Sequence, residues 1–137
     1  MNPTGTDWCA LLGRILLAAL FLPAGVEKLL DLQGTIGAVT QAGMPLPNIA
    51  GPAGAIIEAL APLLLILGLF TRLSAAALIA FTLVASYYFH DYWTMTGADR
   101  MSNQGHFWKN MAVVGGLAYV LAFGAGLISI DARRKRP

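Results

Sequence analysis

One acidic residue, Glu58, lies inside an apolar stretch that is long enough to cross a membrane. It comes about eight residues after the start of a span expected at 50–70, a depth of roughly 12 Å at the helical rise. A charge at that depth costs at least roughly 2.5 kcal/mol, so the side chain is expected to face other helices. Pro62 lacks an N–H group and leaves the carbonyl of Glu58 without its usual helical hydrogen bond. These groups predict one polar site inside the membrane.

Further polar residues are expected above Glu58, at the ends of the neighbouring spans. Lys28 lies near the end of the first span and His90 near the end of the third. Because carboxyl and imidazole groups exchange protons, this set could match proton transfer to electron transfer at a bound quinone or another planar ring. We therefore predict that Glu58, His90 and Lys28 are catalytic residues. The start of the fourth span is expected to add ring-binding contacts from His106, Lys109 and Asn110.

Other interpretations of these residues remain open. Glu58 and Lys28 could form a buried ion pair that only fixes the register of two helices. Imidazoles beside aromatic residues can also contact lipid headgroups without doing chemistry. Ligation of a haem by two histidines needs rings that face each other from two helices, and both histidines lie at an edge. No metal site is predicted, because the spacing of the four candidates matches no strong ligand pattern: His90, Asp91, Asp99 and His106.

The composition indicates that lipid is the main solvent of the chain. Only 12% of the 137 residues are charged, 57% are apolar, and the mean hydropathy is +0.65. A soluble domain of this size needs more polar residues at its surface, and a disordered chain needs low hydrophobicity with high charge. Cys9 alone permits no internal disulfide and no CxxC pair. The net charge of +2 comes largely from residues 133–136, so no basic surface for nucleic acid is predicted.

Four membrane spans are expected, which predicts an all-α integral membrane four-helix bundle, with residues 1–137 as one domain. Turn-forming residues fill the connector 31–49, and polar residues fill the connector 91–107. With four spans both termini share one side. That side carries Arg72 and the basic tail, so the positive-inside rule places both termini in the cytoplasm. The spans are expected at about 8–30, 50–70, 73–93 and 108–128.

Each predicted span has one face that suits contact with its neighbours. Residues at alternating steps of three and four share a helical face, and small residues on that face allow close approach of another helix. This arrangement brings Lys28 toward Glu58 from above. The faces are, in span order, Arg14, Ala18, Phe21, Gly25 and Lys28; Gly51, Gly54, Glu58, Ala61, Leu65 and Gly68; Leu83, Ser86 and His90; and Lys109, Ala112, Gly116, Tyr119 and Phe123.

Four segments of the sequence, taken together and in this order, are similar to a known family. They are 14–21 with 24–29, Glu58 with 68–72, 87–90, and 124–131. The sequence resembles the DoxX family of small bacterial membrane proteins over nearly its whole length. The resemblance implies a four-helix membrane protein related to the DoxD-type subunit of a thiosulfate:quinone oxidoreductase. It also adds Arg14, Gly25 and Tyr87 to the residues expected to bind a cofactor, with quinone as the cofactor implied.

The resemblance and the polar residues favour a quinone-interacting subunit or accessory component of a membrane oxidoreductase in the bacterial inner membrane. The sequence holds no nucleotide fingerprint or cysteine set for an iron–sulfur cluster, so electrons would need a bound quinone, another bound cofactor or a redox partner subunit. A non-enzymatic binding or assembly protein is the alternative, because small-residue faces could dock partner helices or a second copy. A small-molecule transporter is less favoured, since four helices rarely suffice for alternating access. The expected partners are the lipid bilayer and a redox subunit or a homo-oligomer, with no nucleic acid.

Overall fold

The structure is a computed structural model that describes residues 2–134, and over these residues the chain is helical with short connections and no strand. The all-α prediction is confirmed for this part of the chain. The elements are α1 (Gly5–Leu30), α2 (Leu32–Gln41), α3 (Pro47–Leu67), α4 (Thr71–Phe89), the 3-10 turn η1 (Tyr92–Thr94), α5 (Gly97–Phe123) and α6 (Ile130–Arg134).

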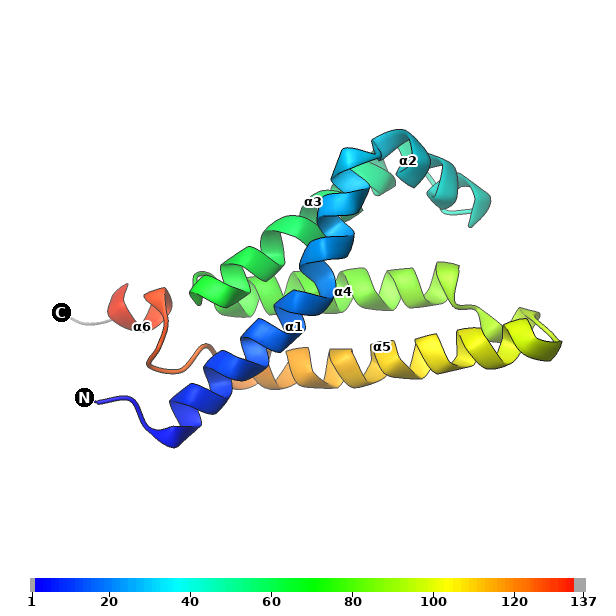
Figure 1. The fold of residues 1–137 in the computed structure, drawn as a ribbon. Coiled ribbons are helices and arrows are strands. Elements are labelled where there is room, and N and C mark those ends of the chain that lie inside the picture. The colour runs from blue at the N-terminus through cyan, green and yellow to red at the C-terminus, as the bar shows by residue number, and fades with distance from the viewer. Residues whose placement is uncertain (1, 135–137) are drawn as a thin grey trace.

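The long helices form two pairs that meet at one end of the molecule and diverge at the other (Figure 1). α1 crosses α3, and α4 packs antiparallel to α5. The start of α1 and the short α6 lie at the same end, which we call the terminal end. α2 packs on α3 at the opposite end, which we call the α2 end. The two ends of the described chain lie at the terminal end. The location of both termini in the cytoplasm stays a prediction.

Three helical segments of the described residues are long and apolar enough to cross a membrane: Gly5–Leu30, Pro47–Leu67 and Thr71–Thr94. They correspond to the first three predicted spans. α5 is also long, but its mixture of charged and apolar residues keeps it out of this group. The structure therefore supports a membrane protein with at least these three spans, whereas the fourth span and the four-helix bundle are not confirmed.

The fourth helix and the connectors differ most from their predicted bounds. α5 begins at Gly97, well before the predicted residue 108, because residues 97–107 contain no proline and the helix continues through them. It ends at Phe123, because Gly124 has φ 81° and breaks the helical backbone. The connector 31–49 also contains a helix, α2, whose start is capped by Asp31: its carboxylate accepts a hydrogen bond from Gly34 N at 2.9 Å.

α1 and α3 approach most closely at Gly25, which lies against the backbone of Glu58 and Ala59. A Cβ atom at position 25 would clash with the carbonyl carbon of Glu58 and would lie 2.5 Å from Ala59 N. The helices can cross at this distance only because the residue at position 25 has no side chain. The same contact encloses the Glu58 carbonyl, which receives no hydrogen bond from Pro62.

The contact faces predicted for the first two spans are confirmed. α1 buries small residues together with Arg14, while Lys28 at the end of the same face is 40% exposed, and α3 buries small residues together with Glu58. The buried residues include Arg14, Ala18, Phe21 and Gly25 in α1, and Gly51, Glu58, Ala61 and Leu65 in α3.

The contact face predicted for the fourth span is wrong, and that predicted for the third span is correct at Ser86, which is 1% exposed, and wrong at Leu83. Leu83 is 44% exposed, Tyr119 is 71% exposed and Phe123 is 78% exposed. Apolar residues suit the lipid-facing side of a helix as well as the inner side, so the apolar pattern does not mark the inner face. In α4 the buried face continues from Ser86 through Thr82, Leu78 and Ser74 at four-residue intervals, and α5 buries Leu117.

A layer of apolar side chains crosses the middle of the molecule and joins all four long helices. Each of its members is at most 6% exposed. We call it the core layer. It separates the polar residues of the terminal end from those of the α2 end, and it consists of Phe21, Ala61, Leu65, Ala75, Leu78 and Leu117.

Residues 124–131, which follow α5, form a closing segment across the terminal end. Its last residue, Asp131, accepts hydrogen bonds from Phe70 N at 3.0 Å and from Thr71 N at 2.9 Å, and so caps the start of α4. At the beginning of the chain, Asp7 accepts a hydrogen bond from Leu127 N at 2.7 Å. The two carboxylates tie the closing segment to the starts of α1 and α4.

Candidate functional site

The predicted approach of Lys28 to Glu58 is present as a direct ion pair between α1 and α3. Lys28 Nζ donates a hydrogen bond to Glu58 Oε2 at 2.6 Å. The Glu58 side chain is 8% exposed and the Lys28 side chain 40% exposed. Glu58 Oε1 accepts no hydrogen bond from any described residue, so one oxygen of the carboxylate is available to a further partner. The pair combines an open acceptor with an ammonium group that has further N–H donors.

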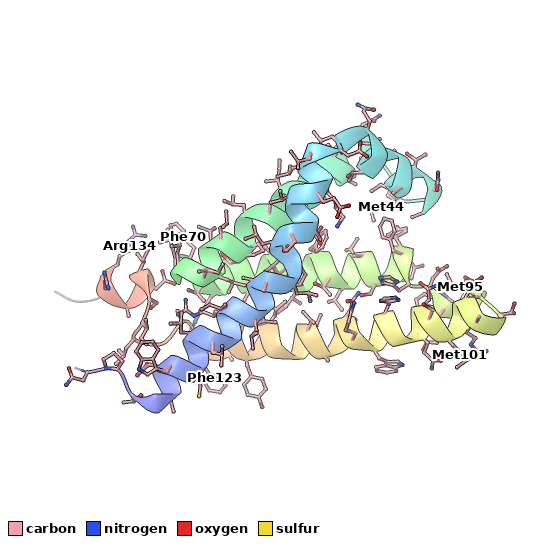
Figure 2. The ribbon with its side chains drawn as sticks, viewed as in Figure 1. Met44, Phe70, Met95, Met101, Phe123 and Arg134 are labelled. Carbon is pink, nitrogen blue, oxygen red and sulfur yellow. The ribbon has the colours of Figure 1, made fainter. Side chains whose placement is uncertain are left out.

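The ion pair lies on the wall of a cavity of about 970 Å³ between the two helix pairs. The end of α1, α2, the first half of α3 and the second half of α4 surround this cavity, so it lies toward the α2 end (Figure 1). Most of the lining is apolar, and Met44 contributes to it; Figure 2 shows Met44 at the α2 end, whereas Phe70 and Arg134 lie at the terminal end. The residues that sequence reasoning placed at a site and that line this cavity are Lys28, Glu58, His90, Lys109 and Asn110.

Two histidines stack at the α2 end, where α4 finishes and α5 passes. The ring centroids of His90 and His106 are 5.1 Å apart with an interplanar angle of 20°. His90 Nδ1 lies 3.1 Å from Asn103 Oδ1, while Asn103 Nδ2 donates to the carbonyl of Asp99. His90 is therefore the donor to Asn103, which leaves Nε2 as the acceptor of the neutral ring. Lys109 Nζ lies 3.4 Å from His106 Nδ1, on the partner ring.

Asn110 belongs to a hydrogen-bonded ladder that joins α5 to α4. Its Nδ2 donates to Ser86 Oγ at 3.0 Å, and Ser86 Oγ donates to the carbonyl of Thr82 at 2.6 Å. Thr82 Oγ1 donates in turn to the carbonyl of Leu78 at 2.7 Å. Sequence reasoning missed Thr82 and Asn103; the recurrence of hydroxyl residues at four-residue intervals in α4 was the signal that could have revealed Thr82.

Arg14 does not line the cavity, because it lies near the terminal end and is 1% exposed. Its Nη1 donates to the carbonyl of Leu65 at 2.8 Å and to that of Ile66 at 3.2 Å, and Nη2 donates to the carbonyl of Ile128 at 2.6 Å. A cation at the carboxyl end of a helix stabilises the unpaired carbonyls and the helix dipole. Arg14 therefore joins the end of α3 to the closing segment. Its role in the structure is to hold these two segments together.

Gly25, Tyr87 and His106 were also expected to contact a cofactor, and none of them lines the cavity. Gly25 is the crossing point of α1 and α3. Tyr87 is 61% exposed and packs edge-on against Tyr88 with a centroid distance of 5.1 Å. His106 contacts two residues of the cavity lining, His90 through the ring stack and Lys109 through Nδ1. No group of three or more metal-ligating side chains occurs among residues 2–134.

Residues 9–91 match the model of the DoxX family. The chain belongs to the DoxX family. The matched range holds the α1–α3 crossing, the ion pair and the whole of α4, which are the elements that form most of the cavity of this DoxX-family protein. A second model, that of the SURF4 family, matches residues 53–136. No solved structure matches the chain.

Two bacterial relatives of this DoxX-family protein are similar over almost its full length. Inner membrane protein YphA of Escherichia coli (strain K12) is 34% identical over 90% of this chain and 88% of that protein. Inner membrane protein YqjF of the same organism is 30% identical over 91% of this chain and 91% of that protein. The Surfeit locus protein 4 homolog of Drosophila melanogaster is 27% identical over 95% of this chain, which spans only 42% of that protein. The names of the bacterial relatives and the apolar helices agree on a membrane protein.

Proposed function

We propose that this DoxX-family protein binds a quinone in the cavity and acts as a quinone-interacting subunit or accessory component of a membrane oxidoreductase. The observation that carries the proposal is the Lys28–Glu58 ion pair on the wall of a large and mostly apolar cavity. Binding sites for small apolar molecules combine apolar walls with a few polar groups that orient the ligand. In the proposed arrangement four helices span the bacterial inner membrane, both termini are cytoplasmic, and the cavity faces the outer side.

The donors and acceptors of the cavity suit both redox forms of a quinone. Lys28 Nζ has N–H groups besides the one directed at Glu58, and these can donate to a ring carbonyl. Glu58 Oε1 can accept a hydrogen bond from a ring hydroxyl, and His90 Nε2 can accept a proton nearer the mouth. A bound quinone would supply two-electron redox chemistry that is coupled to two protons. The residues of the chain would orient the ring and hold or pass those protons.

The apolar walls of the cavity are continuous with the lipid-facing surface of the helices. Leu20, Val84 and Phe89 line the cavity, and each is more than a third exposed. A ligand dissolved in the bilayer can therefore enter from the side, between the diverging helix pairs. This geometry supports a lipid-soluble ring with a tail over a ligand that arrives only from water.

Electron transfer through this site requires a second protein or a soluble electron donor. The sequence has one cysteine, Cys9, and no motif for a redox centre of its own. In the proposal a partner subunit therefore delivers electrons to, or takes them from, the quinone bound here. The alternative is a protein that only assembles other subunits, and it predicts no quinone binding.

The direct test is a quinone titration of the purified protein in detergent, followed by quenching of tryptophan fluorescence. A short-chain naphthoquinone and a short-chain benzoquinone serve as probes, and Trp93 in η1 and Trp108 in α5 serve as fluorophores. We expect saturable quenching that weakens at least tenfold, about 1.4 kcal/mol, in Glu58→Gln and in Lys28→Met. Leu83→Ala, on the lipid-facing side of α4, is the matched control and should bind as the wild type does. Unsaturable quenching, or equal affinity in all variants, would refute the proposal.

A further inference from the structure

The cavity stops at the core layer and does not continue to the terminal end. Phe21 of the core layer forms part of its lining, and Glu58 and Thr82 lie one helical turn from Ala61 and Leu78 respectively. Leu65, Leu78 and Leu117 are fully buried beneath these residues. Close-packed apolar side chains of this kind leave few voids that could hold water.

The polar stripe of α4 is interrupted at the same level. Ser86 and Thr82 lie on the α2 side of the core layer and Ser74 lies on the terminal side, with Leu78 between them. The hydrogen bonds of the stripe end at the carbonyl of Leu78, which Thr82 Oγ1 contacts at 2.7 Å. Ser74 Oγ is buried and has no hydrogen-bond partner among the described residues. A chain of hydroxyl groups that could pass protons is therefore broken at Leu78.

A second closure lies beyond the core layer. Arg14 joins α3 to the closing segment, and Asp131 joins the closing segment to the start of α4. Asp131 N also donates to the carbonyl of Gly68 at 2.8 Å. Hydrogen bonds made by these two charged side chains therefore tie α1, α3, α4 and the closing segment together at this end.

We propose that the cavity is a blind pocket in which water, protons and polar reagents reach Glu58 from the α2 end only. No aqueous path leads from Glu58 through the core layer to the terminal end. One consequence rests on the proposed function: both protons of a bound quinone exchange with the compartment at the α2 end. The protein then couples electron transfer to protons on one side of the membrane without moving protons across it.

Single cysteines and a charged, membrane-impermeant methanethiosulfonate reagent test this proposal. The background is Cys9→Ser, which removes the one native thiol. Ala85→Cys places a thiol in the cavity, Ser74→Cys places one on the terminal side of the core layer, and Asn2→Cys marks the terminal end. Each variant is labelled in intact cells and in inside-out vesicles, so the reagent reaches one face of the membrane at a time.

We expect Ala85→Cys to react from one face only and Asn2→Cys to react from the opposite face only. Ser74→Cys should not react from the face that labels Ala85→Cys. The proposal is overturned if Ala85→Cys is labelled from both faces or from neither face. It is also overturned if Ala85→Cys is labelled from the face that labels Asn2→Cys. Labelling of Ser74→Cys together with Ala85→Cys would also overturn it. The melting temperature of each variant is checked against the background chain.

A wild-type measurement gives a second test that needs no substitution. A water-soluble carbodiimide should activate Glu58 when added from the face that labels Ala85→Cys and should fail to do so from the other face. Modification from both faces would contradict the blind pocket. Neither measurement requires a quinone. One-sided access without quinone binding would support the blind pocket and reject the proposed function. Quinone binding with two-sided access would support the proposed function and reject the blind pocket.

Discussion

Lys28 and Glu58 meet because α1 can approach α3 at Gly25, where no side chain separates the two backbones. The Glu58 carboxylate is nearly buried and loses most of its hydration, which the ammonium group of the 40% exposed Lys28 compensates. The carboxylate keeps one oxygen, Oε1, without a hydrogen bond from the described residues, and that oxygen belongs to a residue of the cavity wall. At the scale of single residues, the ion pair fixes the crossing of two helices and offers an acceptor to a ligand.

The ion pair predicts a specific cross-link. A carbodiimide without a linker should condense the Glu58 carboxyl with the Lys28 amine into an amide, with loss of one water, because the two groups are 2.6 Å apart. Peptide mass spectrometry of the wild type should find residues 28 and 58 joined. Glu27 is exposed and adjacent in sequence, and it should be modified without joining Lys28. Absence of the 28–58 product while Glu27 is modified would contradict the pair.

Gly25→Ala is expected to destabilise the protein by about 1–3 kcal/mol, since the added methyl group overlaps the backbone of α3. Thermal unfolding in detergent, followed by circular dichroism, measures the change. Gly13→Ala in the same helix is the matched control, because a Cβ at position 13 meets nothing within 4 Å. The control should be neutral or slightly stabilising, since alanine favours the helix. Equal effects of the two substitutions would show that the close crossing is not needed.

At the scale of helices, sequence reasoning found the inner faces of α1 and α3, found that of α4 only at Ser86, and missed that of α5. Glu58 and the glycines mark an inner face, because lipid would penalise the charge and leave the small residues without contacts. α4 and α5 carry apolar residues on every side, such as Leu83 and Tyr119, and lipid accepts these as readily as the core does. The inner face of α4 is marked by serine and threonine, whose hydroxyl groups bond to the preceding helical turn and so tolerate burial.

The closing segment predicts the effect of Asp131→Ala. This substitution removes the carboxylate that accepts hydrogen bonds from Phe70 N and Thr71 N, and the unfolding free energy should fall by about 1–2 kcal/mol. Asp99→Ala, in the exposed first turn of α5, is the control and should change it by less than about 0.5 kcal/mol. Thermal unfolding in detergent compares the two variants. If Asp131→Ala has the same melting temperature as the wild type, the closing segment does not stabilise the terminal end.

At the scale of the whole molecule, two helix pairs meet in the core layer and diverge toward the α2 end, where they enclose the cavity. The sequence predicted that Lys28, Glu58 and His90 would share a site, because each ends or interrupts an apolar span on the same side. It could not predict that Arg14 Nη1 and Nη2 would donate to backbone carbonyls, since those carbonyls become available only when α3 ends and the closing segment folds back. Residue type and depth can be inferred from sequence, whereas the partner of a buried charge depends on tertiary contacts.

The broken polar stripe predicts how the barrier of the core layer could be opened. Leu78→Ser would place a hydroxyl group between Ser74 and Thr82 and leave space for water, so passive proton permeability of proteoliposomes should rise above that of the wild type. A pH-sensitive dye inside the liposomes measures it. Leu83→Ser, the same change on the lipid-facing side of α4, should leave the permeability unchanged. Equal permeability of both variants would mean that Leu78 is not the closing point.

Photolabelling with an azidoquinone tests the central claim, quinone binding beside Glu58, most directly. Membranes that contain the protein are illuminated with the probe, and the labelled residues are mapped by peptide mass spectrometry. Quinone binding in the cavity predicts label on cavity-lining residues within 53–58 and 77–85, competition by excess unlabelled quinone, and loss of that label in Glu58→Gln. Label confined to lipid-facing residues such as Leu83 and Tyr119, and unaffected by competition, would contradict it.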